Sequence, residues 1–390
     1  MRPKRSLIYI LAVLITLLLF GTVAPATTID VIVTFDFPGT TVTATLPQKI
    51  EDQTDLVGTV MMADGTVRAF IYKPLSHKFS PLLIPPFANH GPTQGRGINF
   101  RRHVVGDYLN ESDGTFHGYL MVHPNCTPTP TPTATATPTP TATATPSPTP
   151  TATPTPNEGA IAMATASDSP FVDDPDVQPR CPLIYSPFDL TGALSTIPLG
   201  INNLGDICGT AIFSDSQPGF ISVLQVVTTF AVPGATATFA YQVNDSGQII
   251  GYYTDSNGIA HGYTRDSAGT LTFPIDVPGA TQTFLLGNNA SNWAVGTYTD
   301  TSDKTHGLFY VTSDDILTYD YPGATSTSLT GINANGLICG YYTDTAGVIH
   351  GFVARVNVTD SGKPNINTPK APVKPANTLA KVSGIAVPAL

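Results

Sequence analysis

The sequence FAVPGATATFAYQVNDSGQIIGYYTDSNGIAHGY, at residues 230–263, recurs twice later in the chain. Its Pro-Gly pair at 233–234 returns at 278–279 and 322–323, and its His-Gly pair at 261–262 returns at 306–307 and 350–351. Weaker copies lie at about residues 33–73, 80–122 and 183–224. Six copies of one unit of about 45 residues therefore account for most of the folded protein.

Each unit reads as four short strands separated by three turns. In the quoted copy the strands are 230–232, 235–243, 248–254 and 259–264, rich in β-branched and aromatic residues and separated by Pro-Gly, Asn-Asp-Ser-Gly and Asp-Ser-Asn-Gly turns. Four antiparallel strands in a unit of this length are typical of one propeller blade. We therefore predict an all-β, β-propeller-like fold of about six four-stranded blades.

Glycine recurs at one position inside the third strand of the unit, as Gly251, Gly296 and Gly340. Glycine weakens a strand, so its recurrence there usually marks a bulge or the close approach of another backbone. We interpret these positions as places where one blade packs tightly against the next. The weaker copies carry Gly58, Gly106 and Gly209 at the same position.

The unit resembles the HAF-type extracellular repeat, which occurs in tandem in secreted bacterial proteins. The matching motifs are P-G-A-T (233–236, 278–281, 322–325), G-I-N-x-x-G (200–205, 331–336) and G-Y-Y-T-D-x-x-G-x-x-H-G-F (340–352). The resemblance covers most of residues 183–356 well and 33–122 loosely, and His-Gly stands where the family name implies His-Ala. It implies an extracellular repeat protein and no particular activity, substrate or catalytic residue.

Residues 1–26 have the features of a secretory signal peptide. Three basic residues precede an apolar run at 7–20, which is shorter than the roughly 20 residues that span a bilayer, and Ala-Pro-Ala at 24–26 fits a cleavage site. The alternative is an uncleaved anchor; no other segment is long and apolar enough to span a membrane. We therefore predict a secreted or cell-surface protein. The excess of 28 acidic over 18 basic residues argues against nucleic acid or an anionic membrane as a partner.

A Thr/Pro-rich, low-complexity spacer interrupts the repeats. Residues 127–156 contain only Thr, Pro, Ala and one Ser, and the acidic segment that follows extends the predicted disordered region over 126–181. It separates repeats 1–2 (27–125) from repeats 3–6 (182–358), and a disordered tail follows at 359–390. Because two repeats alone would expose a large apolar edge, we favour one ring with the spacer looping out between blades two and three. Two separate domains are the alternative.

The four cysteines fall into two pairs. Cys208 and Cys339 align with aliphatic residues of other repeats, so we expect them to be buried and not bonded to each other. Cys126 and Cys181 lie at the two ends of the spacer segment. A disulfide between them would join these ends, and free thiols are the alternative. No Cys-x-x-Cys spacing suggests a zinc site.

Histidine recurs once per unit as His261, His306 and His350, and His117 belongs to the same set. These side chains could form a metal ring if they faced the central channel. We favour the alternative that each histidine satisfies a backbone group at the edge of its blade, because we identify no carboxylate or second histidine at a ligand spacing beside it. The sequence therefore predicts no metal site and no cofactor.

Aspartate opens the turn before each of these histidines, at Asp255, Asp300 and Asp344. The turn could be a calcium loop, but such loops are richer in oxygen ligands. We favour Asx turns, in which the aspartate caps its own backbone. Asparagine sequons occur in turns at Asn244 and Asn289, where a glycan would be tolerated; the others are at Asn110, Asn125 and Asn357.

Two functions are compatible with these features. The first is a secreted or surface-displayed binding or structural module that does not catalyse a reaction, with a glycan or protein as ligand. The second is a polysaccharide hydrolase or lyase that uses the channel face, although no catalytic motif is present. Catalysis would need acidic residues that break the repeat pattern, and four residues do so: Glu51, Asp107, Glu111 and Asp206.

Overall fold

The computed structural model describes residues 28–88, 91–123, 182–312 and 315–357. This part of the chain folds into 24 β-strands and no helix, which confirms the all-β class. Accordingly, the described residues include no helix of the length and hydropathy needed to cross a membrane. The predicted signal peptide, spacer, tail and Cys126–Cys181 disulfide lie outside the described residues.

The strands form four separate four-stranded sheets and one eight-stranded sheet. The separate sheets are β6 (Thr93–Ile98), β7 (Val104–Asn110), β8 (Thr115–Val122) and β9 (Ile184–Phe188); β10 (Ser195–Ile201), β11 (Ile207–Ile212), β12 (Gly219–Val223) and β13 (Val226–Phe230); β14 (Ala237–Val243), β15 (Ile249–Thr254), β16 (Ala260–Arg265) and β17 (Leu271–Ile275); and β18 (Gln282–Asn288), β19 (Ala294–Thr299), β20 (Thr305–Thr312) and β21 (Asp315–Tyr319).

The prediction of about six separate four-stranded blades is therefore wrong: four blades are separate sheets. The remaining eight strands are β1 (Thr28–Phe35), β2 (Val42–Ile50), β3 (Leu56–Met62), β4 (Val67–Lys73), β5 (Lys78–Phe79), β22 (Ser326–Ile332), β23 (Leu337–Thr343) and β24 (Ile349–Asn357). Strand β24 joins β22 and β23 to β2–β5 through a single parallel pair, Ala44 and Ile349, which merges two groups of four strands into one sheet.

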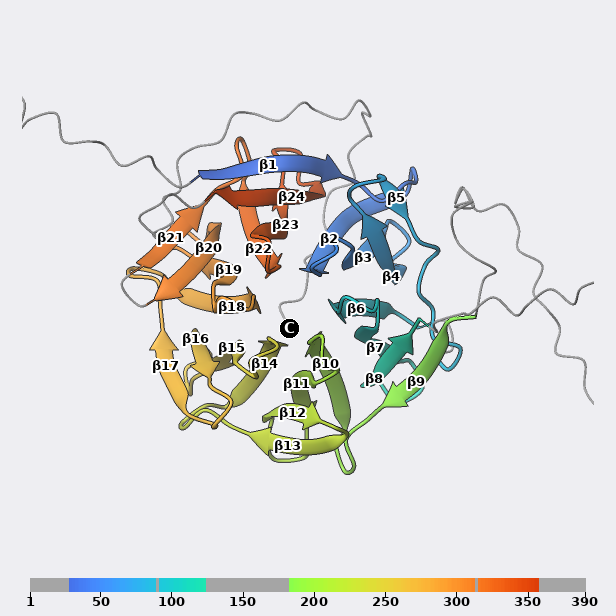
Figure 1. Cartoon of the computed structure of the whole chain (residues 1–390), viewed down its shortest axis with the longest axis vertical. Coiled ribbons are helices and arrows are strands. Elements are labelled where there is room, and N and C mark those ends of the chain that lie inside the picture. Colours follow the sequence, from blue (N-terminus) through green and yellow to red (C-terminus); the bar gives the residue numbers. More distant parts are fainter. Residues whose placement is uncertain (1–27, 89–90, 124–181, 313–314, 358–390) are drawn as a thin grey trace, which may run out of the picture. The chain divides into compact units, whose positions relative to one another are not determined.

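The sheets are arranged radially around a common centre, as in a propeller (Figure 1). The innermost strands are β2, β6, β10, β14, β18 and β22, and each contacts the innermost strand of the neighbouring sheet. Residues on both sides of the segment 124–181 belong to this one compact unit.

The sheets are out of phase with the sequence repeat by one strand. The first predicted strand of the unit, residues 230–232, overlaps the end of β13 at Phe230, and β13 pairs with β12 as the outer strand of the preceding sheet. The spacer is also placed differently: β8 and β9 flank it in the sequence and pair in the same sheet. The prediction that it loops out between two blades is therefore wrong.

The N-terminal strand closes the arrangement. Strand β1 pairs antiparallel with β24 from Thr28–Asn357 to Phe35–Gly351, with a bulge between Val31 and Val33. Figure 1 shows the two strands side by side at the periphery. The first and last described strands of the chain therefore complete one sheet, as the one-strand offset requires.

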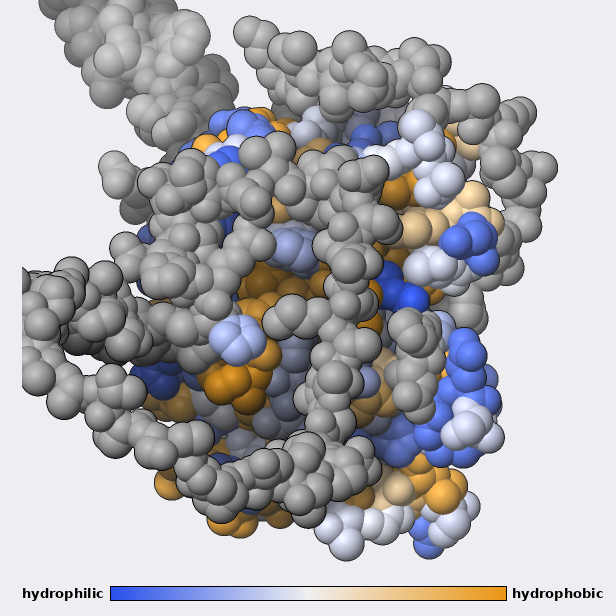
Figure 2. All heavy atoms as spheres, turned by 90° about the vertical axis from the view of Figure 1, so that its right-hand side faces the viewer, coloured by the Kyte–Doolittle hydropathy of each residue, from blue (hydrophilic) through white to orange (hydrophobic). Residues whose placement is uncertain are grey.

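The core consists of apolar layers between neighbouring sheets. Its largest fully buried side chains include the aromatic residues Phe70, Phe220, Phe309 and Phe352, which come from the third strand of four different groups. On the side shown in Figure 2, the described surface mixes hydrophobic and hydrophilic residues. The repeat thus buries its apolar face by stacking one unit on the next.

The recurring strand glycines allow a close approach within one sheet. A Cβ atom on Gly251 would lie 1.8 Å from the carbonyl oxygen of Phe239 in the paired strand, opposite a bulge. Gly296 and Gly340 meet the equivalent oxygens of Phe284 and Ser328 at 1.9 and 2.2 Å. The close backbone approach is confirmed, but the prediction that the neighbour is the next blade is wrong.

Tight packing between sheets instead occurs at glycines of the innermost strands. A Cβ atom on Gly200 would lie 2.9 Å from Cα of Gln242, and one on Gly287 would lie 2.8 Å from Cα of Gly331. Gly331 in turn lies against the backbone of Lys49. Backbones of neighbouring innermost strands therefore touch near the centre.

Replacing Ile29 with alanine should lower the free energy of unfolding by about 2–5 kcal/mol, because Ile29 is fully buried between β1 and the core. The matched control is Ile32→Ala in the same strand, since Ile32 is 53% exposed and should change stability by less than about 0.5 kcal/mol. Urea unfolding of both variants measures the difference. Equal losses would contradict the packing of β1.

Replacing Gly251 with alanine should destabilise the fold by roughly 3 kcal/mol or more, because the new methyl group meets a backbone oxygen that cannot move independently. Gly219→Ala is the control, since its Cβ would lie 3.2 Å from the movable ring of Phe230. Thermal unfolding would show a much larger fall in Tm for Gly251→Ala. A milder effect there than at Gly219 would refute the predicted backbone clash.

Candidate functional site

The turns divide the central region into two ends. Consecutive turns of an antiparallel sheet lie at opposite ends of its strands. Turns between the first and second strands, such as 244–248, form what we call the asparagine end. Turns between the second and third strands, such as 255–259, form the histidine end.

At the asparagine end, side chains link each turn to the next. The Nδ2 group of Asn202 donates to the carbonyl oxygen of Asn244 at 3.2 Å, and Nδ2 of Asn244 donates to that of Asn289 at 2.9 Å. Asn99 and Asn333 make the same kind of bond at 3.1 and 3.0 Å. The asparagine of the G-I-N-x-x-G motif is therefore a structural residue that joins neighbouring sheets.

Glu51 takes the place of asparagine in one turn. Its carboxylate accepts from the backbone amides of Gln53 and Asp55 at 2.7 and 2.8 Å, as asparagine does elsewhere, and its carbonyl oxygen accepts from Asn333. Burial raises the pKa of Glu51 to about 7, although the two amides act in the opposite direction. This out-of-pattern acid completes the turn network.

Asn244 and Asn289 are buried in this network, with 5% and 4% of their surface exposed. Their side-chain amides are engaged with the next turn. The prediction that these two sequons would tolerate a glycan is therefore wrong.

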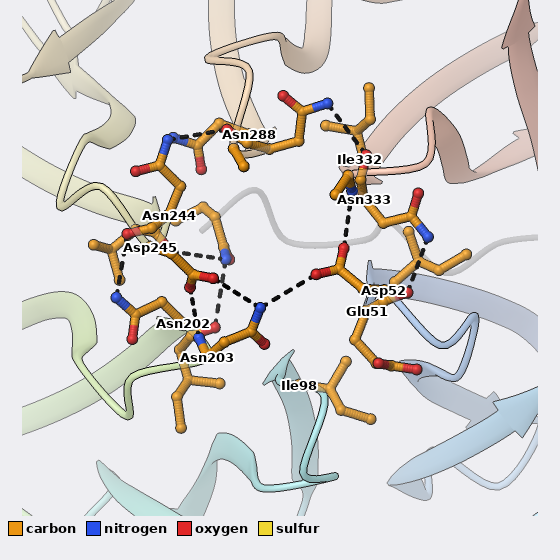
Figure 3. Close-up of a pocket in the computed structure, with 17 residues that line it drawn as sticks. Glu51, Asp52, Ile98, Asn202, Asn203, Asn244, Asp245, Asn288, Ile332 and Asn333 are labelled. Atoms are coloured by element: carbon orange, nitrogen blue, oxygen red, sulfur yellow. Dashed lines mark hydrogen bonds between the residues drawn. The ribbon is translucent and has the colours of Figure 1, made fainter.

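A small polar cavity of about 60 Å³ lies inside the asparagine end (Figure 3). Asn203 donates from Nδ2 to Asp52 at 3.2 Å and to Asp245 at 2.9 Å. These three side chains converge across the opening (Figure 3). The volume corresponds to about two water molecules, so this end is too small for a sugar ring.

At the histidine end, each recurring histidine bridges two carboxylates. Nδ1 of His306 lies 2.8 Å from Asp320 and its Nε2 lies 3.2 Å from Asp300; in His350 the same nitrogens lie 2.9 Å from Asp36 and 3.5 Å from Asp344. His117 and His261 repeat the arrangement with Asp189 and Asp276. The prediction that each histidine satisfies a backbone group is wrong, because its ring nitrogens face carboxylates.

Each of these histidines also stacks on a tyrosine of the preceding strand. The ring centroids of Tyr298 and His306 are 4.9 Å apart, and those of Tyr342 and His350 are 5.1 Å apart. The described residues contain no group of three or more His, Cys, Asp and Glu side chains placed to hold a metal ion. Each histidine therefore links the third strand of its sheet to the turn before that strand and to the residue that follows the outer strand.

The turn aspartates act as Asx caps, as predicted. Oδ1 of Asp255 accepts from the amides of Asn257 and Ile259 at 2.8 and 2.9 Å, and Asp300 and Asp344 repeat the pattern. The amide of Ile259 is the largest cause that holds the pKa of Asp255 below its usual value.

Sequence reasoning missed the second aspartate of each histidine bridge. The signal is present, because Asp36, Asp276 and Asp320 each stand two residues before a Pro-Gly turn. One unit lacks both residues. Pro218 takes the place of the histidine before Gly219, and Ala231 takes the place of the aspartate before the Pro-Gly turn. The two positions change together within the chain because they are in contact.

The centre of the fold contains two buried cations that sequence reasoning also missed. Nζ of Lys49 donates to the carbonyl oxygens of Leu286 and Thr330 and lies 5.1 Å from the ring centroid of Tyr241. Burial lowers the pKa of Lys49 to about 7. Nε of Arg96 lies 2.7 Å from Oδ1 of Asp107. Burial opposes the positive charge of Arg96, but Asp107 keeps the pKa of Arg96 above its usual value.

The other residues singled out from the sequence have structural places. Cys208 and Cys339 are buried free thiols, as predicted, and burial raises the pKa of Cys208 to about 12 and that of Cys339 to about 11. Asp206 accepts from Nδ2 of Asn202 at 2.9 Å, and Glu111 is exposed. Of the four out-of-pattern acids, Asp107 is the one paired with a cation beside the channel.

A cavity of about 220 Å³, which we call the channel pocket, lies beside Arg96. Its walls come from β6, β8, β10, β11, β14 and β15, and they include residues close to the histidine-end turns, Phe116 and Gln217. Phe239 and Tyr241 are only partly buried, and Phe239 stacks on Tyr252 with ring centroids 4.5 Å apart. The pocket therefore combines aromatic walls with one cationic group.

The buried side-chain oxygens without a hydrogen-bond partner in the described residues include Oγ1 of Thr59 in β3 and Oδ2 of Asp107 in β7. The two residues occupy equivalent positions, each directly after the recurring glycine of its strand. Buried polar atoms are usually paired with protein, water or a ligand. Thr59 is 2% and Asp107 0% exposed, and neither lines the channel pocket, so these two oxygens lie in the interior of the fold.

The sequence matches no protein-family model and no curated protein. Among solved structures, TolB from Acinetobacter baumannii is 11% identical with a TM-score of 0.43, covering 80% of this chain and 66% of that one. The Hadza microbial sialidase is 10% identical with a TM-score of 0.44, covering 81% and 66%. The Aleuria aurantia lectin in complex with Fucα1-6GlcNAc is 9% identical with a TM-score of 0.41, covering 84% and 99%. This chain thus spans just under two thirds of the first two proteins, and all three are distant.

Stability should fall as the pH rises through the pKa of His350. Burial lowers this pKa, but the hydrogen bond to Asp36 and the charge of Asp36, together with Asp344, raise it above 6.5 overall. A histidine with a raised pKa contributes its full stabilisation below the pKa of the unfolded state and loses it above the folded-state value.

His350→Gln should therefore flatten the dependence of stability on pH above about 6.5. The expected difference is about 0.2–1 kcal/mol, as for partly exposed pairs. Urea unfolding from pH 5 to 9 measures it, with Asp36→Asn as the matched variant that should flatten the same region. An unchanged slope in both variants would contradict the pairing.

Proposed function

We propose that this chain is a secreted or surface-displayed member of the HAF-type extracellular repeats and that it acts as a carbohydrate-binding module without catalytic activity. The signal-peptide features of residues 1–26, the acidic composition and the repeat motifs support the extracellular location. The channel pocket supports the binding function.

The observation that carries the proposal is the composition of the channel pocket walls. Aromatic side chains from two strands, Phe116 of β8 and Phe239 and Tyr241 of β14, surround about 220 Å³ together with Arg96. Aromatic faces contact the apolar faces of sugar rings, and a few polar groups fix ring orientation. The volume is below the roughly 300–1,000 Å³ of sites for drug-sized molecules, so it suits one sugar residue at a time.

A protein ligand is supported less well by the same geometry. A stable protein interface buries on the order of 800 Å² on each partner and is usually built on an exposed surface. The channel pocket is instead a concave site between three neighbouring sheets. It would admit a terminal sugar or one side chain, but not a protein face.

Binding is also supported over hydrolysis. Glycoside hydrolysis usually requires two carboxyl groups on either side of the scissile bond. Of the residues that line the channel pocket, none is acidic, and the carboxylate beside it, Asp107, is paired with Arg96. The arrangement can hold a sugar but does not offer the acid and base pair of a glycosidase.

Tyr241→Ala should weaken carbohydrate binding by roughly tenfold or more, because it removes an aromatic wall of the pocket. The matched control is Tyr298→Ala, since Tyr298 stacks on His306 outside the pocket and its loss should leave binding unchanged. A glycan array followed by calorimetry on the hits measures both. Equal binding by wild type and Tyr241→Ala would contradict the assigned site, and turnover of a bound polysaccharide would contradict the non-catalytic assignment.

A further inference from the structure

The charge balance beside the channel pocket is positive. Arg96 and Lys49 supply two cationic side chains, and Asp107 supplies the one carboxylate that pairs with either of them in the described part of the chain. Lys49 is 4% exposed and is held by backbone carbonyl oxygens. A buried cation without a counter-ion is unfavourable, and a nearby anion would offset this.

Arg96 has donor groups that its ion pair does not use. The contact with Asp107 is made by Nε, at 2.7 Å, while Arg96 itself lines the cavity. A guanidinium group carries five N–H donors in a planar fork, which matches a carboxylate in a two-point contact. The guanidinium group also forms a hydrogen bond with the side chain of Tyr241, and its remaining N–H groups can bind a ligand while Nε holds Asp107.

Lys49 acts on the pocket through one aromatic ring. Its Nζ lies 5.1 Å from the ring centroid of Tyr241, and Tyr241 is a wall of the pocket. Because the surroundings are buried, the charge is poorly screened over this short separation. The field of Lys49 thus favours negative charge in the cavity.

We infer that the channel pocket prefers a sugar residue that bears a carboxylate, such as a uronic acid, over its neutral counterpart. The aromatic walls hold the ring, Arg96 takes the carboxylate, and Lys49 supplies the balancing charge. Asp107 lies behind the pocket lining and holds Nε of Arg96 in place. This inference rests on the proposed carbohydrate-binding function.

The test uses matched sugar pairs on the full chain at low salt and at about pH 6, where Lys49, with its pKa of about 7, is mostly charged. Calorimetry compares methyl β-glucuronide with methyl β-glucoside, and methyl α-galacturonide with methyl α-galactoside. We expect the acidic member of at least one pair to bind roughly tenfold more tightly, the scale of a hydrogen bond to a charged group. The Lys49→Met variant should lose most of this preference, so that the ratio of the acidic to the neutral affinity falls toward one.

Controls separate the local charge from the overall charge. Lys304→Met removes an exposed lysine that pairs with Asp320 outside the pocket and should leave the preference intact. Because removing Arg96 alone would leave Asp107 unpaired, the double variant Arg96→Gln with Asp107→Asn tests the arginine, with thermal unfolding as the check of folding. It should bind neutral and acidic sugars equally.

The outcomes distinguish this inference from the proposed function. Equal or tighter binding of the neutral sugars, still lost in Tyr241→Ala, would overturn the preference for acidic sugars and leave the carbohydrate-binding function in place. An acidic preference that persists in both Lys49→Met and the double variant would overturn the assigned charges. Failure of all four sugars and of the glycan array would overturn both proposals.

Discussion

The pairing of β1 with β24 is the contact on which the rest of the structure depends. It joins residues more than 300 positions apart in the sequence, Thr28 with Asn357 and Phe35 with Gly351. Without β1, the outer edge of β24 would expose unpaired backbone groups and the apolar face that Ile29 covers. Because each sheet stacks on its neighbours, an open edge at one place would leave the innermost strands free to separate, and three of them, β6, β10 and β14, form part of the channel pocket.

Residues that recur in the repeat are used for structure. Asparagines at one end donate to the next turn, and histidines at the other end bridge two aspartates. The donor and acceptor groups of these residues already form hydrogen bonds or ion pairs within the protein, so few of them remain to bind a ligand. The features suited to binding are those that break the pattern: Arg96, Lys49 and Asp107 occur at positions where other units carry uncharged residues.

The burial of Lys49, one of the residues that break the repeat pattern, lowers the stability of the fold. Lys49 is buried among carbonyl oxygens and aromatic carbon, and its pKa is lowered to about 7 as a result. A methionine of similar size would avoid the loss of hydration that burial of an ammonium group entails. A charged residue held in such a position is more easily understood as part of a site than as part of the core.

The sequence by itself determined the strand content, the repeat and the local turn chemistry. The spacing of Pro-Gly and Asp-x-x-Gly turns predicted antiparallel strands, and the Asx caps at Asp255 and its equivalents formed as expected, because these depend on interactions within a few residues. The strand glycines were also recognisable as places of close backbone approach.

Only the tertiary structure decided how the units join. A repeat has no intrinsic starting point, so the sequence could not show that the first strand of each unit completes the preceding sheet, that β1 pairs with β24, or that β8 and β9, which flank the spacer in the sequence, pair in one sheet. It likewise could not show that two sheets merge through the Ala44–Ile349 pair. The channel pocket gathers residues 96 and 116, 199 and 217, and 241 from three units, and the proximity of these units depends on packing over long separations in the chain, which local patterns do not encode.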